Sequence, residues 1–464
     1  MNQKTKQILE WSFILLVIIG FLGFKLANLT FHFGDSNAYF YMAKAMTQGE
    51  LPYRDFFLAD PPFLILFLAG LRLFFGDHLL FYQALPIILE SATALILFFL
   101  LRKQNNPLAF LAPLVYLFSF SVLALSDYLT GVQLVVFLFV LALLFFEQNH
   151  PFLSGFFWGL SLLTKLYVLP AFLGFALFVF LEKDRRVLVR LINGLVCCLL
   201  LVMGPLVLLS FPRVVDDLLI HHLNRPAGLN KLEVFTFLFK REWLLIGLAV
   251  AGALVNRQKK FLLPFCLTVV FLIFFPDLYY TYFGSLLPYL VILSLSFVAW
   301  LWAKSLVGQD WSIFILILYI LFLSVSFWYY QQSFFIHGRF LNAIEVADYL
   351  KTRPETFPLY GSHEVAPLVA LLSQKKLLNG YIDTNPQVFA SGALDLEIVS
   401  RAAVQNGVFL LARITDRPEE GITDFGYEGF FSPRAFRESC QRLKEFPSTA
   451  QESDNHLVIY RCSR

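Results

Sequence analysis

The sequence predicts an α-helical polytopic membrane protein with a small soluble α/β domain at its C-terminus. Hydrophobic residues make up 58% of the 464 residues and charged residues only 15%, whereas charged residues form about a quarter of a typical soluble protein. Apolar runs of bilayer-spanning length recur up to about residue 330, and the composition becomes that of a soluble chain after residue 340. We therefore expect a membrane domain over 1–330 and a soluble domain over 340–464.

About eleven transmembrane helices are expected. The apolar runs lie near residues 11–30, 79–101, 107–125, 129–147, 152–182, 187–211, 242–256, 261–276, 283–303 and 311–330. As one straight helix the run 152–182 would be ~46 Å long, against a hydrocarbon core of ~30 Å. We therefore interpret it as two short helices that meet near Lys165. The first run follows a basic start and lacks a convincing cleavage site, which indicates an uncleaved anchor.

The distribution of basic residues predicts the orientation. Lys and Arg gather at the N-terminus and in alternate loops, which places the N-terminus in the cytoplasm of a bacterial or archaeal cell. This count requires the apolar piece 63–75 to lie at the outer interface without crossing. The polar loops 31–78 and 212–240 and the C-terminal domain are then extracytoplasmic. Cys440 and Cys462 could pair on that side if the fold brings them together.

The C-terminal domain alternates predicted strands and helices, which is typical of a small α/β fold. The expected strands are FPLYG (357–361), KLLNG (376–380), VFLLARI (408–414) and HLVIYRC (456–462), and the expected helices are ALDLEIVSRAAVQ (393–405) and SPRAFRESCQRLKEF (432–446). The turn Gly361-Ser362-His363-Glu364 is interpreted as structural. Catalytic and phosphate-binding motifs are not evident in this domain.

An acidic residue directly after the first span is the first candidate for chemistry. Asp35 precedes Tyr39, Met42, Ala43 and Met46, whose spacing predicts an amphipathic helix lying in the membrane interface. A carboxylate there can be an ordinary interfacial charge. It can also reach both lipid-borne and aqueous molecules.

The stretch GDSNAYFYMAKAMTQGELPYRDFFLADPPFLILFLAGLRLFFGDHLL (34–80) resembles the first outer loop of the GT-C glycosyltransferases, especially the protein O-mannosyltransferases and the aminoarabinose transferases of lipid A. The matching positions are Asp35, Ala45, Gly49, Tyr53, Asp55, Pro61, Pro62, Phe75 and Gly76. Further similarity lies in Asp127 of LALSDYLTG, in GLSLLTK ending at Lys165, in the basic loop from His221 to Arg225, and in YFGSLLP from Tyr282. The resemblance covers roughly 11–330.

The resemblance implies a hexosyl- or pentosyltransferase that takes a monosaccharide from a polyprenyl-phosphate donor at the bilayer. The acceptor, a protein, a lipid or an envelope glycan, would be extracytoplasmic, and the anomeric carbon would be inverted. Asp35 would be the general base and Asp127 a second catalytic residue, while Lys165 and Arg225 would bind the phosphate. The other expected substrate-binding residues are Tyr53, Asp55, His222 and Tyr282.

Each of these residues also has an alternative role. Asp127 can position the acceptor, pair with Lys165, or cap the fourth span. Lys165 can snorkel to the membrane surface, and Arg225 can meet lipid headgroups. Tyr282 can belong to an aromatic belt. The GT-C group includes metal-dependent members, so a divalent metal is a candidate cofactor, although adjacent His221 and His222 lack metal-ligand spacing.

Two positions depart from the family pattern. Ser36 stands where the family often has a second acid, and Asp60 stands where the aminoarabinose transferases have a phosphate-contacting Lys. A transporter or lipid flippase is the main alternative, but paired sequence halves are not evident. A scaffold that keeps the fold without catalysis is a third reading. The scattered basic residues do not support nucleic-acid binding.

Overall fold

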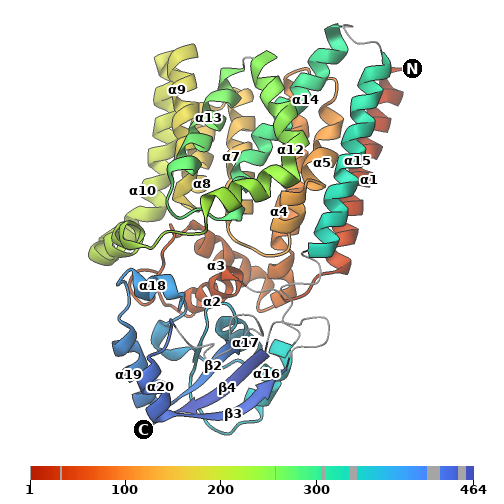
Figure 1. Cartoon of the computed structure of the whole chain (residues 1–464). Coiled ribbons are helices and arrows are strands. Elements are labelled where there is room, and N and C mark those ends of the chain that lie inside the picture. Colours follow the sequence, from red (N-terminus) through yellow and green to blue (C-terminus); the bar gives the residue numbers. More distant parts are fainter. Residues whose placement is uncertain are drawn as a thin grey trace. The chain divides into compact units, whose positions relative to one another are not determined.

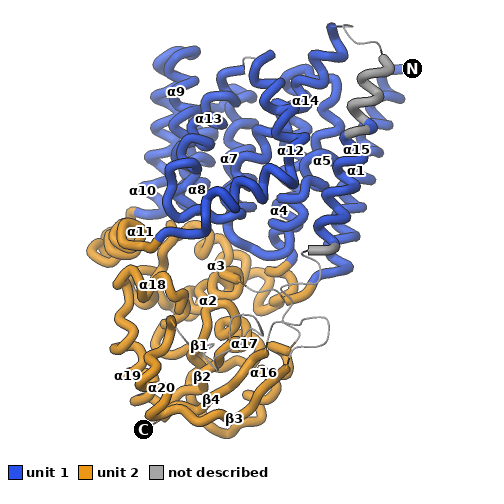
Figure 2. Tube along the Cα trace, in the orientation of Figure 1, with its two compact units in different colours: residues 1–29, 84–203, 227–334 blue, residues 30–83, 204–226, 335–464 orange. Residues whose placement is uncertain are grey.

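The computed structural model describes residues 2–31, 34–255, 258–304, 309–333, 342–414, 429–447 and 456–463. The chain divides into two compact units (Figure 2). Unit 1 consists of residues 1–29, 84–203 and 227–334, and unit 2 consists of residues 30–83, 204–226 and 335–464. Unit 2 therefore combines the first polar loop and part of the second with the C-terminal domain.

Unit 1 is a bundle of helices (Figure 1). Its helices are α1 (Gln3–Ala27), α4 (Leu79–Lys103), α7 (Val132–Glu147), α8 (Pro151–Leu162), α9 (Leu169–Glu182), α10 (Arg185–Val215), α12 (Lys231–Val255), α13 (Lys259–Phe274), α14 (Leu287–Lys304) and α15 (Gln309–Ser333), of which α4 begins and α10 ends in unit 2. Closely packed pairs are α12 with α14, α7 with α8, and α9 with α13.

Within the residues that the structure describes, four helical stretches are long and apolar enough to cross a membrane. They are Gln3–Ala27, Leu79–Lys103, Arg185–Asn224 and Tyr280–Lys304. Shorter apolar helices cover Phe63–Phe75, Val132–Glu147, Pro151–Leu162 and Leu166–Glu182. The total of about eleven spans stays a prediction.

The expected break near Lys165 is confirmed. Helix α8 ends at Leu162, Lys165 has an extended backbone with φ −152° and ψ 129°, and the short 3₁₀ helix η2 (Leu166–Val168) leads into α9. The run 107–125, expected as one span, is instead divided into η1 (Ala109–Leu111), α5 (Ala112–Leu117) and α6 (Phe120–Leu125). Ser119 contributes to that division, because its side chain caps α6 by accepting from the Val122 amide.

The first polar loop forms two helices, α2 (Asp35–Thr47) and α3 (Phe63–Phe75). The helix expected after Asp35 is present, but eight of its 13 residues are buried. It packs against α3 and against α17 (Ala366–Ser373) of the same unit. Apolar side chains such as Phe40 and Met42 allow this burial, so α2 is an internal helix and not a surface-lying amphipathic one.

The C-terminal domain contains a four-stranded sheet in the order β1-β2-β4-β3. The strands are β1 (Leu359–Gly361), β2 (Val408–Ile414), β3 (Cys440–Phe446) and β4 (His456–Cys462), and the helices around them are α16 (Asn342–Lys351), α17, α18 (Pro386–Ala390), α19 (Leu396–Asn406) and α20 (Pro433–Ser439). β1 and β2 are parallel, and the other pairings are antiparallel.

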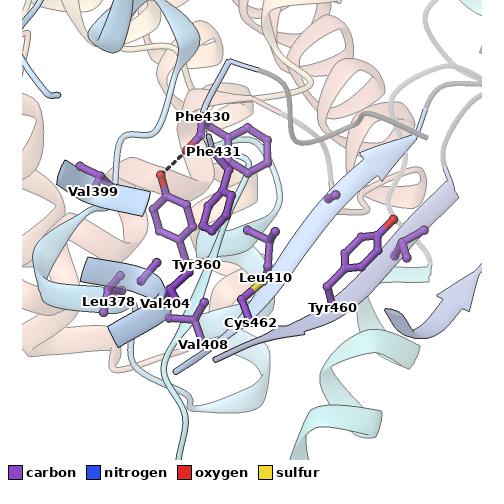
Figure 3. Close-up of a cluster of buried hydrophobic side chains, with 13 residues drawn as sticks. Tyr360, Leu378, Val399, Val404, Val408, Leu410, Phe430, Phe431, Tyr460 and Cys462 are labelled. Atoms are coloured by element: carbon purple, nitrogen blue, oxygen red, sulfur yellow. Dashed lines mark hydrogen bonds between the residues drawn. The ribbon is translucent and has the colours of Figure 1, made fainter. Parts of the chain in front are cut away.

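A cluster of buried side chains joins this sheet to its helices (Figure 3). Tyr360 of β1, Leu410 of β2 and Val399 of α19 belong to it. The Tyr360 hydroxyl donates to the Phe430 carbonyl oxygen at 2.5 Å, which satisfies the polar end of an otherwise buried ring.

Two predicted elements of this domain are wrong. The segment 432–446 is not one helix, because α20 ends at Ser439 and strand β3 begins at Cys440. Cys440 lies opposite Cys462 of β4, and the two form a disulfide. The segment KLLNG makes only an isolated bridge between Leu377 and Leu359, followed by a 3₁₀ turn at Leu378–Gly380.

Candidate active site

Asp35 is the first residue of α2, in unit 2. Its neighbour Gly34 has a φ of 108°, a conformation that glycine adopts readily and other residues do not. The amide groups of the first helical turn favour a negative charge at this end of the helix. The Asp35 side chain is 52% exposed, so an incoming molecule can reach its carboxylate.

His363 of the C-terminal domain lies beside Asp35, and Asn385 of the same domain lies beside His363. Nε2 of His363 is 3.9 Å from Oδ1 of Asp35, and Nδ2 of Asn385 is 3.5 Å from the same histidine nitrogen. Asp383 belongs to this cluster electrostatically. Burial raises the pKa of the Asp383 carboxyl, the Asp35 charge raises it further, and His363 and Arg225 oppose the shift.

Two contacts hold the turn that carries His363, one to helix α2 and one to strand β2. Nδ2 of Asn37, in the first turn of α2, donates to the Glu364 carbonyl oxygen at 2.9 Å. The Glu364 carboxylate pairs with Arg413 of β2 at 2.6 Å. Sequence reasoning missed His363 as a site residue. The available signal was its position after β1, because ligands of sheets with parallel strands often bind at the carboxyl ends of those strands.

Arg225 and His222, both expected to bind substrate, also lie in unit 2. Nε of Arg225 donates to Oε1 of Gln387 at 2.5 Å, and Nε2 of His222 is 2.8 Å from the Ala59 carbonyl oxygen. The carboxylate of Asp60, the residue after Ala59, accepts from the Tyr39 hydroxyl at 2.9 Å. The unit thus brings Arg225 and Asp35 into one electrostatic cluster through Asp383.

Tyr53 and Asp55 build a tight turn in the first loop. Tyr53 is buried, has a φ of 64°, and donates from its hydroxyl to the Asp60 carbonyl oxygen at 2.8 Å. Asp55 accepts from the Leu51 amide at 2.8 Å and pairs with Arg54 at 2.7 Å, and this pairing lowers the pKa of its carboxyl. These contacts favour a structural task for both residues, which shape the loop after α2.

Asp127 lies in unit 1, between α6 and α7. Its carboxylate forms an ion pair with Lys25 of α1 and accepts from the Tyr330 hydroxyl of α15 at 2.6 Å. Lys25 also donates to the Leu123 carbonyl oxygen at 2.9 Å. The sequence offered Lys165 as the partner of Asp127, whereas the structure provides Lys25. These contacts link α1 to α15 and favour a structural role for Asp127.

Lys165 and Tyr282 lie near the same break in unit 1. Lys165 precedes η2, and the ring of Tyr167 within η2 packs on Tyr282 with centroids 4.8 Å apart. Tyr279 contacts the same Tyr282 ring edge-on at 6.0 Å. Tyr282, which also contacts Tyr279, therefore packs on η2, the short helix that follows Lys165.

A divalent metal was a candidate cofactor. Within the described part of the chain, no group of three or more His, Cys, Asp or Glu side chains could hold a metal ion. His222 is turned to the Ala59 carbonyl and His221 to the Ser391 hydroxyl, 2.7 Å from its Nδ1.

Comparison with solved structures shows that the chain has the GT-C fold. It is similar over 99% of its length to the crystal structure of ArnT from Cupriavidus metallidurans bound to undecaprenyl phosphate, with a TM-score of 0.62, 12% sequence identity and 98% of that chain covered. The same protein in its apo state gives a TM-score of 0.64 at 11% identity, with 98% of each chain covered. Both comparisons include the C-terminal domain as well as the helical bundle.

A second solved protein, the arabinofuranosyltransferase AftD from Mycobacteria, covers 98% of this chain with a TM-score of 0.58 and 13% identity. This chain spans 40% of AftD. No protein-family model matches the sequence, and no curated protein sequence matches it. The fold and the four long apolar helices identify a multi-pass integral membrane protein.

Proposed function

We propose that this chain is a membrane glycosyltransferase that moves a monosaccharide from a polyprenyl-phosphate donor to an extracytoplasmic acceptor. The observation that carries the proposal is Asp35, a half-exposed carboxylate at the start of a buried helix, in a chain with the GT-C fold. The undecaprenyl phosphate bound to ArnT supports a donor with a polyprenyl carrier.

Asp35 acts as the general base in this proposal. It takes the proton of the acceptor hydroxyl while that oxygen attacks the anomeric carbon, and the bond to the carrier phosphate breaks on the opposite face of the sugar. The configuration at the anomeric carbon is inverted as a result. A half-exposed carboxylate at a helix N-terminus suits this task, because an acceptor hydroxyl can approach it from solvent.

Positive charge must stabilise the leaving phosphate. We assign this role to Arg225, whose guanidinium could bind two phosphate oxygens at once, and to Lys165, which lies at the helix break before η2. Tyr282 would then lie against the donor near Lys165. Asp127 is already engaged by Lys25 and Tyr330, so we assign it the task of holding α1 and α15 together.

The disulfide between Cys440 and Cys462 supports an extracytoplasmic C-terminal domain, because disulfides persist mainly in oxidising compartments. Asp35 and His363 belong to the same compact unit as this disulfide. We therefore place the reaction at the outer face of the membrane.

The experiment that tests this function supplies radiolabelled polyprenyl-phosphate sugars to proteoliposomes that contain the full chain and candidate acceptors of each class. We expect label to move to an acceptor and free polyprenyl phosphate to appear in equal amount. NMR of the product should show the inverted anomeric configuration. Labelled carrier that crosses the bilayer intact, with no cleaved phosphate, would contradict the proposal and favour a flippase. Parallel reactions with and without a chelator test whether a divalent metal is needed.

A further inference from the structure

We propose that His363 is a positioning residue for Asp35, so that the C-terminal α/β domain completes the base of the transferase. The inference rests on the proposed function, because it gives His363 a task in that reaction. The Asp35 carboxylate lies at the start of α2, whereas His363 lies in the turn after β1. The contact between these two side chains therefore connects the first polar loop with the C-terminal domain within unit 2.

The exposed fractions of the two side chains fit a catalytic role for Asp35 and a positioning role for His363. His363 is 13% exposed and Asp35 is 52% exposed. The histidine therefore lies on the protein side of the carboxylate, and a substrate approaches from the open side. Nε2 of His363 faces Oδ1 of Asp35. Oδ2 then remains the oxygen that is better placed to take a proton.

The relative position of the two residues is set by a direct link between their segments. Asn37, two residues after Asp35, donates to the carbonyl oxygen of Glu364, the residue after His363, at 2.9 Å. On the other side of the turn, Oγ1 of Thr384 donates to the Gly361 carbonyl oxygen at 2.5 Å. Two hydrogen bonds from side chains to backbone carbonyl oxygens, one before and one after His363 in the chain, thus hold this residue beside Asp35.

The separation of 3.9 Å is longer than a hydrogen bond, so the two side chains face each other in the resting protein without a direct hydrogen bond. Catalytic hydrogen bonds are often long before substrate binds and shorten in the reacting complex. A small rotation of the Asp35 side chain would allow His363 to donate to Oδ1 and to restrict the carboxylate to one orientation. Nδ2 of Asn385 lies 3.5 Å from Nε2 of His363. When His363 donates to Asp35, the Asn385 amide must turn its oxygen toward the ring, because Nε2 cannot accept from Nδ2 and donate to Oδ1 at once.

Kinetics of variants test this role. His363→Ala should lower kcat about 10- to 100-fold, since a misplaced catalytic group costs rate, and should leave the donor KM within about twofold. His363→Gln keeps a donor nitrogen and should recover most of the rate. The matched control is His456→Ala, which removes a histidine that pairs with Glu445 in the same domain. In the Asp35→Asn background, His363→Ala should cause no further loss, because its effect acts through Asp35. An equal loss in both backgrounds would overturn the proposal.

Spectroscopy separates a failure of this inference from a failure of the proposed function. The full chain is labelled with ¹⁵N-histidine in lipid nanodiscs, and the resonances of His363 are identified by their absence in His363→Gln. Asp35→Asn should shift these resonances and leave those of His456 unchanged. Unmoved His363 resonances would overturn the inference even in an active transferase. An inactive wild type with shifted resonances would overturn the catalytic role and leave the contact established.

Discussion

At the scale of single residues, the site consists of charged groups that differ in their access to water. Asp35 is half exposed, His363 is largely covered, and Asp383 is buried enough for its pKa to be raised. A buried carboxyl tends to keep its proton, whereas the exposed Asp35 carboxylate can be reached by an acceptor hydroxyl. This difference favours Asp35 over Asp383 as the base.

The raised pKa of Asp383 predicts how stability depends on pH. An unfolded aspartate titrates near about 3.9, so above that pH the unfolded state has lost a proton that the folded state retains. Stability must therefore fall as pH rises from about 4 toward the raised pKa. Asp383→Asn removes this dependence, and its melting temperature should exceed that of the wild type increasingly as the pH rises through that range. Melting curves at several pH values check this, with exposed Asp348→Asn as the control. Parallel curves for wild type and Asp383→Asn would refute it.

At the scale of elements, the ion pair of Lys25 and Asp127 connects α1 with the segment before α7, and Tyr330 adds α15. The Lys25 side chain is only 2% exposed. Removing one partner of a buried pair leaves the other charge uncompensated, whereas replacing both with apolar residues is often tolerated. Variants that remove one partner of the Lys25–Asp127 pair should therefore be much less stable than a variant that replaces both.

Lys25→Met should destabilise the protein by about 3–5 kcal/mol, as expected for a broken buried ion pair. The double variant Lys25→Met/Asp127→Leu should regain most of that loss. Thermal unfolding in detergent measures both effects. Transfer activity per folded molecule should be retained in the double variant. Loss of activity with restored stability would instead return Asp127 to the catalytic residues.

The helix break at Lys165 and strands β2 and β4 could be predicted from the sequence because their signals are local. An apolar run too long for the bilayer requires a break, and short apolar runs such as VFLLARI, which begins and ends with a β-branched residue, favour strands. Strand β3 could not be predicted, because the spacing of its residues also fits the preceding helix. Its conformation depends on pairing with β4 and on the disulfide between Cys440 and Cys462.

The contact between Asp35 and His363 could not be predicted either. The hydrogen bond that aligns their segments joins Asn37 and Glu364, which are 327 residues apart. Local patterns contain no information about such a meeting. Asp35 was found through its loop motif, whereas His363 occupies a turn whose sequence has no distinctive spacing.

At the scale of the whole molecule, the GT-C fold is retained at 12% identity to ArnT over nearly the full chain. Ser36 and Asp60, the two residues that depart from the pattern of the GT-C family, both lie in unit 2. Ser36 is buried in α2, and the Asp60 carboxylate accepts from the Tyr39 hydroxyl. Asp60 therefore has a structural partner in the position where a phosphate-binding lysine is expected.

The Cys440–Cys462 disulfide gives a test of orientation and stability together. Replacing both cysteines with serine should lower stability by about 3 kcal/mol, the effect expected for a cross-link that spans 22 residues. In intact cells, a membrane-impermeant thiol reagent should label Cys440 and Cys462 only after mild reduction. Labelling that requires permeabilised cells would place the C-terminal domain inside and contradict the proposed topology.

Asp35 is the proposed general base of the sugar transfer. The most direct test of this role is the rate of transfer by Asp35→Asn in proteoliposomes at saturating donor, with Asp348→Asn as a matched surface control. We predict that Asp35→Asn lowers kcat by about 10²- to 10⁴-fold, the contribution that a general base typically makes. The variant should still bind the donor and should melt at the wild-type temperature. Transfer by Asp35→Asn at the rate of the control would contradict this role.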